Sequence, residues 1–200
     1  MMFKRNAFLA VAMLCGAILA SVAQAAGPAK AQVCSACHGP DGNSSNPIWP
    51  NLAAQNPSYI IAQLKAFKAG TRDNPAMMPM MTGLEDVDLN EIAAFFAAQS
   101  LHVAPIPTAD AAAGQMLYRG GDAERGIPAC MACHGPDGAG NLASGYPALR
   151  GQHPEYTVAQ LQNYRDGKRQ TDPQQMMRMI AKRLSNEDMQ HLARYVSALH

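Results

Sequence analysis

Apolar residues recur at helical spacing in two matching stretches, one near the end of each half of the chain. In the first half they occupy positions i, i+3, i+4 and i+7, at Leu89, Ile92, Ala93 and Phe96. The same spacing returns 100 residues later, at Met189, Leu192, Ala193 and Val196. Each set forms one apolar stripe along a helix, which has to pack against a core. The pattern predicts one such helix in each half.

A second pair of segments indicates an internal repeat. The run from Leu52 to Tyr59 matches the run from Leu149 to Tyr156, 97 residues further on, and each leads into an apolar helical segment. These segments end at Gly70 and Gly167, and glycine is common just past a helix. No stretch has a convincing strand pattern. The fold predicted from the sequence is therefore all-α, with two domains of similar design.

The start and the middle of the chain suggest its division. A basic start and an apolar run over residues 7–20, too short to span a bilayer comfortably, are followed by small residues at Ala23-Gln24-Ala25. This pattern is typical of a cleaved signal peptide, with an uncleaved anchor as the alternative. Two prolines, Pro105 and Pro107, interrupt helix between the halves. The predicted parts are residues 1–25 (signal peptide), 26–104 and 105–200 (two domains).

Each predicted domain contains one Cys-x-x-Cys-His run followed by Gly-Pro-Asp-Gly. The six residues are Cys34, Cys37, His38, Cys130, Cys133 and His134. Two thiols three positions apart lie on one helical turn and can reach both vinyl groups on one haem edge, while the following imidazole can ligate the iron. A disulfide in each run is disfavoured because each pair would close a very short loop. The runs predict two covalent haem c groups.

The second axial ligand is predicted from the methionine-rich loops before the two last helices. These loops contain Met77, Met78, Met80, Met81, Met176, Met177 and Met179. When the halves are aligned backwards from their last helices, only Met77 and Met177 coincide. We expect them to be the thioether ligands, with Met80 and Met81 as alternatives at the first haem. Filled axial positions suit an electron carrier and argue against an enzyme, so no catalytic residue is predicted.

Other side chains around the predicted haems are less sharply defined. Arg72, Arg150 and Arg169 can pair with haem propionates, and the residue types alone do not choose among them. A backbone carbonyl in the loop around Pro47 is expected to accept a hydrogen bond from the ring of His38. The formal net charge of +1 gives no sign of a nucleic-acid-binding surface.

Taken together, these motifs resemble the cytochrome c4 family of dihaem cytochromes. The resemblance rests on both Cys-x-x-Cys-His-Gly runs, on the Pro-x-Leu-x-x-Gln pieces at 50–55 and 147–152, and on the methionine loops. It implies two class I cytochrome c domains in tandem, related by a pseudo-twofold axis, with haems facing each other across the interface. The family's axial methionines fall on Met77 and Met177.

The resemblance also implies a periplasmic electron carrier, sometimes attached peripherally to the membrane. Electrons would come from a quinol-oxidising complex or a periplasmic dehydrogenase and go to a terminal oxidase, for instance one of the cbb3 type, or to a reductase. The main alternative is the haem subunit of a periplasmic oxidoreductase such as flavocytochrome c sulfide dehydrogenase. Catalysis by the chain itself, as in dihaem peroxidases, is disfavoured because both halves supply methionine at the same place. The motifs do not specify the donor, the acceptor or the two potentials.

Overall fold

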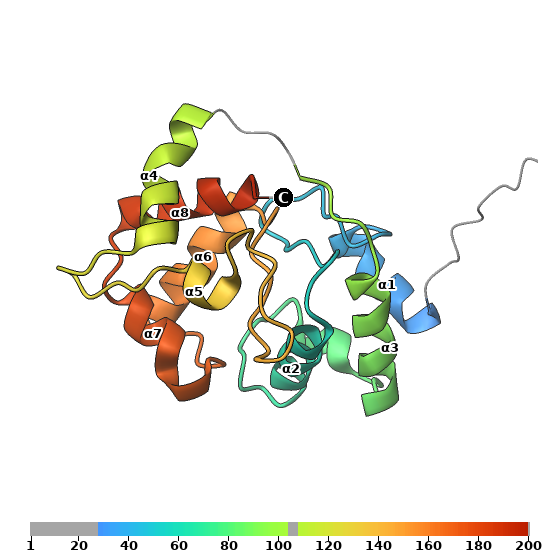
Figure 1. Cartoon of the computed structure of the whole chain (residues 1–200). Coiled ribbons are helices and arrows are strands. Elements are labelled where there is room, and N and C mark those ends of the chain that lie inside the picture. The colour runs from blue at the N-terminus through green and yellow to red at the C-terminus, as the bar shows by residue number, and fades with distance from the viewer. Residues whose placement is uncertain (1–27, 104–107, 200) are drawn as a thin grey trace, which may run out of the picture.

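The computed structural model describes residues 28–103 and 108–199, so the predicted signal peptide (1–25) lies outside the described residues. The first domain contains α1 (Ala29–His38), α2 (Pro57–Lys68), the short 3-10 helix η1 (Met78–Met81) and α3 (Asp86–Ala97). The second domain contains α4 (Thr108–Gly120), α5 (Met131–His134), α6 (Pro154–Arg165), the 3-10 turn η2 (Pro173–Gln175), α7 (Met176–Ala181) and α8 (Asn186–Ser197). The two groups of helices lie side by side (Figure 1). The predicted all-α class is confirmed.

The helix ends follow from local side-chain chemistry. The Asn56 side chain accepts the N–H of Ser58 at the start of α2, and α8 begins with a capping box between Ser185 and Asp188. In α3, the Asp88 carboxylate accepts the N–H of Glu85 at 2.7 Å. These bonds satisfy N–H groups that have no partner inside the helix.

The two apolar stripes predicted for the last helices are buried, as expected. Leu89, Ala93 and Phe96 have no exposed surface, and Met189 and Ala193 have none either. The α3 stripe packs with Leu64, Phe67 and Met81 to form the first core. The α8 stripe packs with Tyr118 and Ile127 to form the second. Each domain therefore has its own small core built on its last helix.

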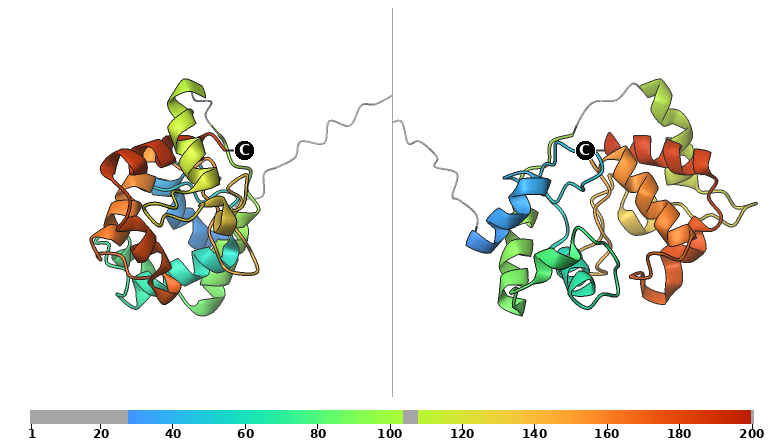
Figure 2. Two further views of the ribbon diagram at one scale, coloured as in Figure 1. Left: turned by 60° about the vertical axis from the view of Figure 1, so that its left-hand side comes forward. Right: turned by 180° about the vertical axis from the view of Figure 1, so that it is seen from behind.

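Loops account for much of the rest of each domain. Within residues 28–103 and 108–199, β pairing is limited to two isolated bridges, Asp122–Ile127 and Asn141–Tyr146. The loops that follow the Cys-His runs lie between the two groups of helices in Figure 1 and in the right-hand view of Figure 2. Residues from these loops therefore meet the other domain directly.

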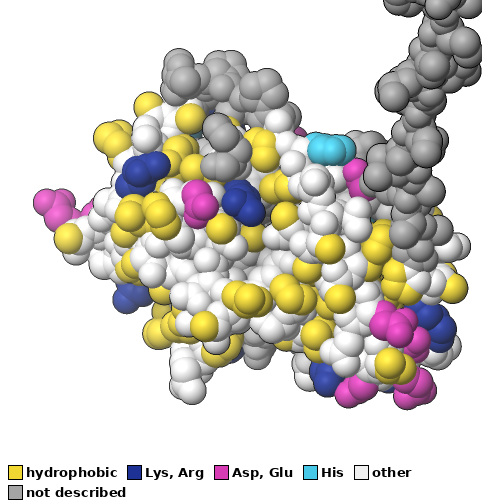
Figure 3. All heavy atoms as spheres, turned by 45° about the vertical axis from the view of Figure 1, so that its right-hand side comes forward, with side chains coloured by type: hydrophobic (Ala, Val, Ile, Leu, Met, Phe, Trp, Pro, Cys, Tyr) yellow, Lys and Arg dark blue, Asp and Glu magenta, His cyan; other side chains and the backbone are white. Residues whose placement is uncertain are grey.

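The outer surface carries mixed charge. Acidic and basic side chains gather at one end of the molecule, at the lower right of Figure 3. At the start of α3, the carboxylate of Asp86 lies 2.9 Å from the Lys65 ammonium, and that of Asp88 lies 3.3 Å from the Lys30 ammonium. No helix in the described part of the chain is long and apolar enough to cross a membrane.

Candidate functional site

In the first domain, the end of α1 presents two thiols and one imidazole. Cys34 is half-buried, Cys37 is exposed, and only 5% of the His38 surface is accessible. The Nδ1 of His38 lies 2.8 Å from the carbonyl oxygen of Pro50. A carbonyl can only accept, so Nδ1 carries the proton and Nε2 is left with the lone pair that can bind iron. The acceptor lies in the predicted loop and is the carbonyl of Pro50.

The second domain repeats this arrangement. The short helix α5 carries Cys133 and ends at His134, with Cys130 as its N-cap residue. The Nδ1 of His134 donates to the carbonyl of Pro147 at 2.9 Å, and the ring of Tyr146 lies 6.3 Å from the imidazole. Burial lowers the pKa of His134, as it does for His38, although the proline carbonyl opposes the shift in both. Both imidazoles are thus neutral donors held in one orientation.

The four thiols are free rather than paired as disulfides, so the disfavoured disulfide alternative is wrong. Cys34 packs against the first core and Cys130 against the second. Burial raises the pKa of Cys34, and it raises that of Cys130 to about 11. In both domains the first cysteine therefore lies against the apolar core while the second faces outward.

The methionines of the first loop have different environments. Met77 is half-buried and packs on the same core as Cys34. Met81 is 4% exposed and fills that core, whereas Met78 and Met80 are 39% and 46% exposed. The side chain and carbonyl of Asn74 both accept the N–H of Met77. Met77 and Met81 thus both contact the core on which Cys34 packs, and the bonds to Asn74 fix the backbone at Met77.

In the second domain, Met177 lies half-buried in α7 and is supported differently. Asp172, whose side chain is 1% exposed, accepts the backbone N–H of Arg178 at 2.9 Å and its Nε at 2.7 Å. The neighbouring Met176 sulfur lies 4.0 Å from the Tyr146 hydroxyl. A buried ion pair therefore fixes the residue next to Met177, where the first domain uses the neutral Asn74.

Two glutamines join the domains reciprocally. The Gln55 side chain donates to the carbonyl of Ala148 at 2.9 Å and accepts its N–H at 2.8 Å. The Gln152 side chain makes the same two bonds to Asn51, at 3.0 and 2.8 Å. The sequence repeat matches Gln55 with Gln152 but gives them no role. Their reciprocal pairing gives this surface approximate twofold symmetry.

Two of the three arginines considered as partners of haem propionates lie at the contact between the domains. Arg72 is 8% exposed and Arg169 is 4% exposed, and each donates to hydrogen-bond acceptors in both domains. Arg150 instead lies 3.8 Å from Asp137 on its own domain. Within the described residues no carboxylate lies within ion-pair distance of Arg72 or Arg169. Buried cations without carboxylates fit a cofactor that brings its own, as the two propionates of a haem do.

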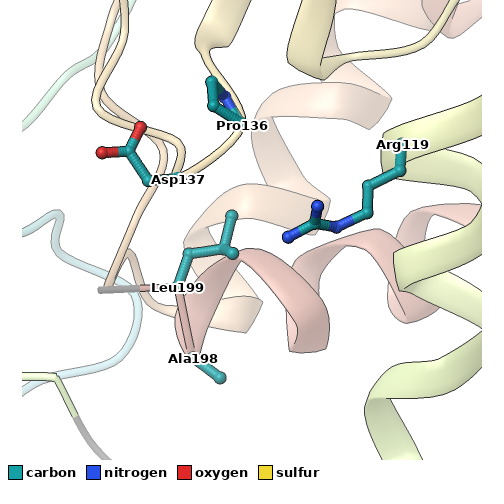
Figure 4. A pocket seen from close by; sticks show the side chains of 5 residues that line it. All are labelled: Arg119, Pro136, Asp137, Ala198 and Leu199. Carbon is teal, nitrogen blue, oxygen red and sulfur yellow. The ribbon is translucent and has the colours of Figure 1, made fainter.

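A separate hollow of about 410 Å³ lies on the second domain, lined by Arg119, Pro136, Asp137, Ala198 and Leu199 (Figure 4). It contains no thiol, imidazole or thioether. The Arg119 side chain at its edge donates to the Tyr195 hydroxyl at 3.0 Å. This hollow is therefore not the place where the cofactor-binding side chains gather.

Comparison with known proteins agrees with the site. The cytochrome c family profile matches twice, over residues 24–100 and 111–200. Cytochrome c4 from Azotobacter vinelandii is 42% identical over 186 residues, covering 88% of this chain and 89% of that protein. The thiosulfate dehydrogenase electron acceptor of Thiomonas intermedia is 39% identical, covering 95% of this chain and 89% of that protein.

The crystal structure of reduced cytochrome c4 from Pseudomonas stutzeri superposes with a TM-score of 0.83 at 42% sequence identity. The match covers 88% of this chain and 100% of the cytochrome c4 chain. The duplicated Cys-Cys-His sites, the helical domains and these relatives lead to one conclusion. The chain belongs to the cytochrome c4 family and is a dihaem electron-transfer protein, with haem c attached at Cys34 and Cys37 and at Cys130 and Cys133.

Proposed function

We propose that His38 and Met77 ligate the first haem iron, that His134 and Met177 ligate the second, and that the protein carries electrons in the periplasm. The observation that carries this proposal is the repeated bond from histidine Nδ1 to a proline carbonyl. It presents the same imidazole nitrogen in both domains. When bound, each haem supplies a one-electron iron couple.

The chain's own groups suit this role. A carbonyl acceptor on Nδ1 fixes the ring plane and raises the basicity of the ligating nitrogen. A thioether ligand favours ferrous iron and so raises the reduction potential. With both axial positions held by side chains, small oxidants find no open site. The thioether bonds of the cysteines and the packing of Cys34 and Cys130 on the cores keep the geometry constant between oxidation states.

The location and partners follow from the signal-like segment and from the relatives. Residues 1–25 would direct export and be removed, leaving domains over 26–104 and 105–200. A membrane quinol-oxidising complex or a periplasmic dehydrogenase would donate electrons, and a terminal oxidase, for instance one of the cbb3 type, or a reductase would accept them. The dehydrogenase donor is favoured as a specific candidate because two relatives, 39% and 38% identical, are named electron acceptors of thiosulfate dehydrogenase.

The ligand assignment is tested by replacing one methionine at a time. We expect Met77→Ala and Met177→Ala each to abolish about half of the near-infrared band that ferric haem shows with a thioether ligand. Met80→Ala, in the same loop, is the matched control and should leave the band intact. Loss of the first-haem component in Met80→Ala but not in Met77→Ala would contradict the assignment. Reversible low-spin reduction steps at both haems in the unaltered protein would support the carrier function.

A further inference from the structure

The buried arginines form a symmetric pair at the domain boundary. Arg72 donates to Gln63 of its own domain at 2.9 Å, and to Tyr156 and Gln160 of the other domain at 3.0 and 2.9 Å. Arg169 mirrors this arrangement, as it donates to Gln160 of its own domain and to Tyr59 and Gln63 of the other. The glutamine oxygens are shared, so each guanidinium is positioned by side chains from both domains.

The positive charges of Arg72 and Arg169 meet no opposite charge among their hydrogen-bond partners. These partners are phenols, amides and a threonine hydroxyl, all of them neutral. Burying an ion without an opposite charge costs several kcal/mol even when its hydrogen bonds are made. The guanidinium carbons lie 4.6 Å from the ring centroids of Phe67 and Tyr164, which offsets only part of that cost.

The positive charge of the two arginines also affects the pKa of a neighbouring phenol, Tyr156. Burial by itself raises the pKa of Tyr156, yet Arg72 and Arg169 overcome it and hold that pKa below its usual range. The two arginines also lie close in sequence to the proposed ligands, Arg72 before Met77 and Arg169 before Met177. Phe67, under the Arg72 guanidinium, belongs to the core on which Cys34 and Met77 pack. The Arg72 charge is thus connected to the first haem site through direct contacts, and Arg169 shares its hydrogen-bond acceptors.

We propose that Arg72 and Arg169 act together as a shared counter-charge for the haem carboxylates at the domain boundary, and that they raise the reduction potentials of both haems in common. The inference rests on the proposed function, since it requires a haem in each domain. A positive charge disfavours the oxidised iron, which carries one more positive charge than the reduced iron. Because each arginine is bound by both domains, neutralising one is expected to lower both potentials.

Spectroelectrochemical titration of the haem-loaded full-length protein tests the proposal. In Arg72→Gln we expect the oxidised-to-reduced ratio at a fixed solution potential to rise about tenfold at the first haem, or about 59 mV for a one-electron couple. The second haem should shift in the same direction. Gln63→Glu, which places a carboxylate between the two guanidinium groups while keeping their hydrogen bonds, should lower both potentials as well.

Two variants separate charge from structure. Arg72→Lys keeps the charge but loses the forked hydrogen bonds, so its potentials should stay close to those of the unaltered protein while its unfolding free energy falls. Lys65→Gln removes one positive charge, as Arg72→Gln does, but from a side chain of α2 that is 53% exposed. It should therefore move neither potential appreciably.

The proposal is overturned if both potentials in Arg72→Gln and in Gln63→Glu stay within the range of Lys65→Gln, or if only one haem responds. If Arg72→Gln does not fold, the potentials of Gln63→Glu decide the question by the same criterion. Such a failure would leave the carrier function intact, because the unaltered protein would still show two reversible low-spin steps. Absence of those steps in the unaltered protein would instead refute the proposed function itself.

Discussion

At the scale of single residues, the Asp188 carboxylate joins the start of α8 to the loop before α5. It accepts the N–H of Ser185 at 2.7 Å and two bonds from the Arg125 guanidinium, at 2.7 and 3.2 Å. The hydrogen bonds from Arg125 lower the pKa of Asp188 below its ordinary value of 3.8, although partial burial opposes them. Charge-assisted bonds at a side chain that is 16% exposed are expected to stabilise the domain measurably.

We therefore expect Asp188→Asn to lower the free energy of unfolding by about 1.5–3 kcal/mol at neutral pH. A carboxyl with a depressed folded-state pKa stabilises the protein above its unfolded pKa, and this contribution is lost as pH falls through the folded value. The difference between the two proteins should thus persist down to pH ~4 and disappear below it. Urea unfolding of both proteins at a series of pH values measures this difference in the free energy of unfolding. Asp86→Asn, at a side chain that is 71% exposed, is the control and should leave the free energy of unfolding nearly unchanged.

At the scale of elements, α4 crosses α8 at a glycine. A Cβ on Gly114 would clash with the backbone carbonyl of His191 and lie 2.8 Å from the Cβ of Tyr195. The two helices approach this closely only because Gly114 has no side chain. We expect Gly114→Ala to destabilise the second domain by about 1–3 kcal/mol, measured by urea unfolding. Gly120→Ala, near the end of the same helix with nothing within 4 Å, should be neutral or slightly stabilising, and equal effects of the two would contradict the explanation.

Helix α7, which contains Met177, depends on the buried pair of Asp172 and Arg178. Removing one partner of a buried ion pair typically costs about 3–5 kcal/mol, because the other charge is left uncompensated. If Met177 is the second ligand, the near-infrared band of the second haem in Asp172→Asn should disappear at a lower urea concentration than the band of the first haem. Asp166→Asn, at a side chain that is 40% exposed, removes a surface ion pair and serves as the control. Simultaneous loss of both bands in Asp172→Asn would argue against a local role.

The elements themselves were largely predictable from the sequence. The stripes of α3 and α8, and the ends of α2 and α6 before Gly70 and Gly167, follow from periodicity and from glycine, whose signals are local. The loop that supplies the acceptor for His38 was predicted, but the acceptor residue was not, because every residue offers a carbonyl. The identity of that acceptor depends on how the loop folds back, which no spacing encodes.

At the scale of the whole molecule, the contact between the domains was not predicted in its residues. The offset of 97 residues that pairs Gln55 with Gln152 also pairs Arg72 with Arg169 and Gln63 with Gln160. Equivalent positions indicate that two residues have similar surroundings in the two domains. They do not indicate that the hydrogen-bond partners of each residue lie in the opposite domain. Polar side chains that bond to a distant backbone leave no periodic pattern. The repeat could have identified these residues as a set, and only the structure shows that they face each other.

The reciprocal glutamines bind backbone groups of the opposite domain, so they should make unfolding of the two domains cooperative. Replacing Gln55 and Gln152 with leucine keeps their approximate size but leaves the buried N–H and C=O groups of Ala148 and Asn51 without partners. Each unpaired buried group costs about 1–3 kcal/mol. We expect the unaltered protein to unfold in one calorimetric transition.

In the double variant Gln55→Leu/Gln152→Leu, scanning calorimetry should resolve two transitions, with the lower one shifted down in temperature. Each domain retains its own core, so the near-infrared band of each haem should persist until the transition of its own domain. Gln170→Leu, which removes a hydrogen bond to the Gly167 carbonyl within the second domain, is the matched control and should leave a single transition. A single transition in the double variant, at the temperature of the unaltered protein, would mean that the remaining contacts between the domains, the arginine pair among them, are enough to couple them. The variants at Arg72 and Gln63 would then be the ones to separate them.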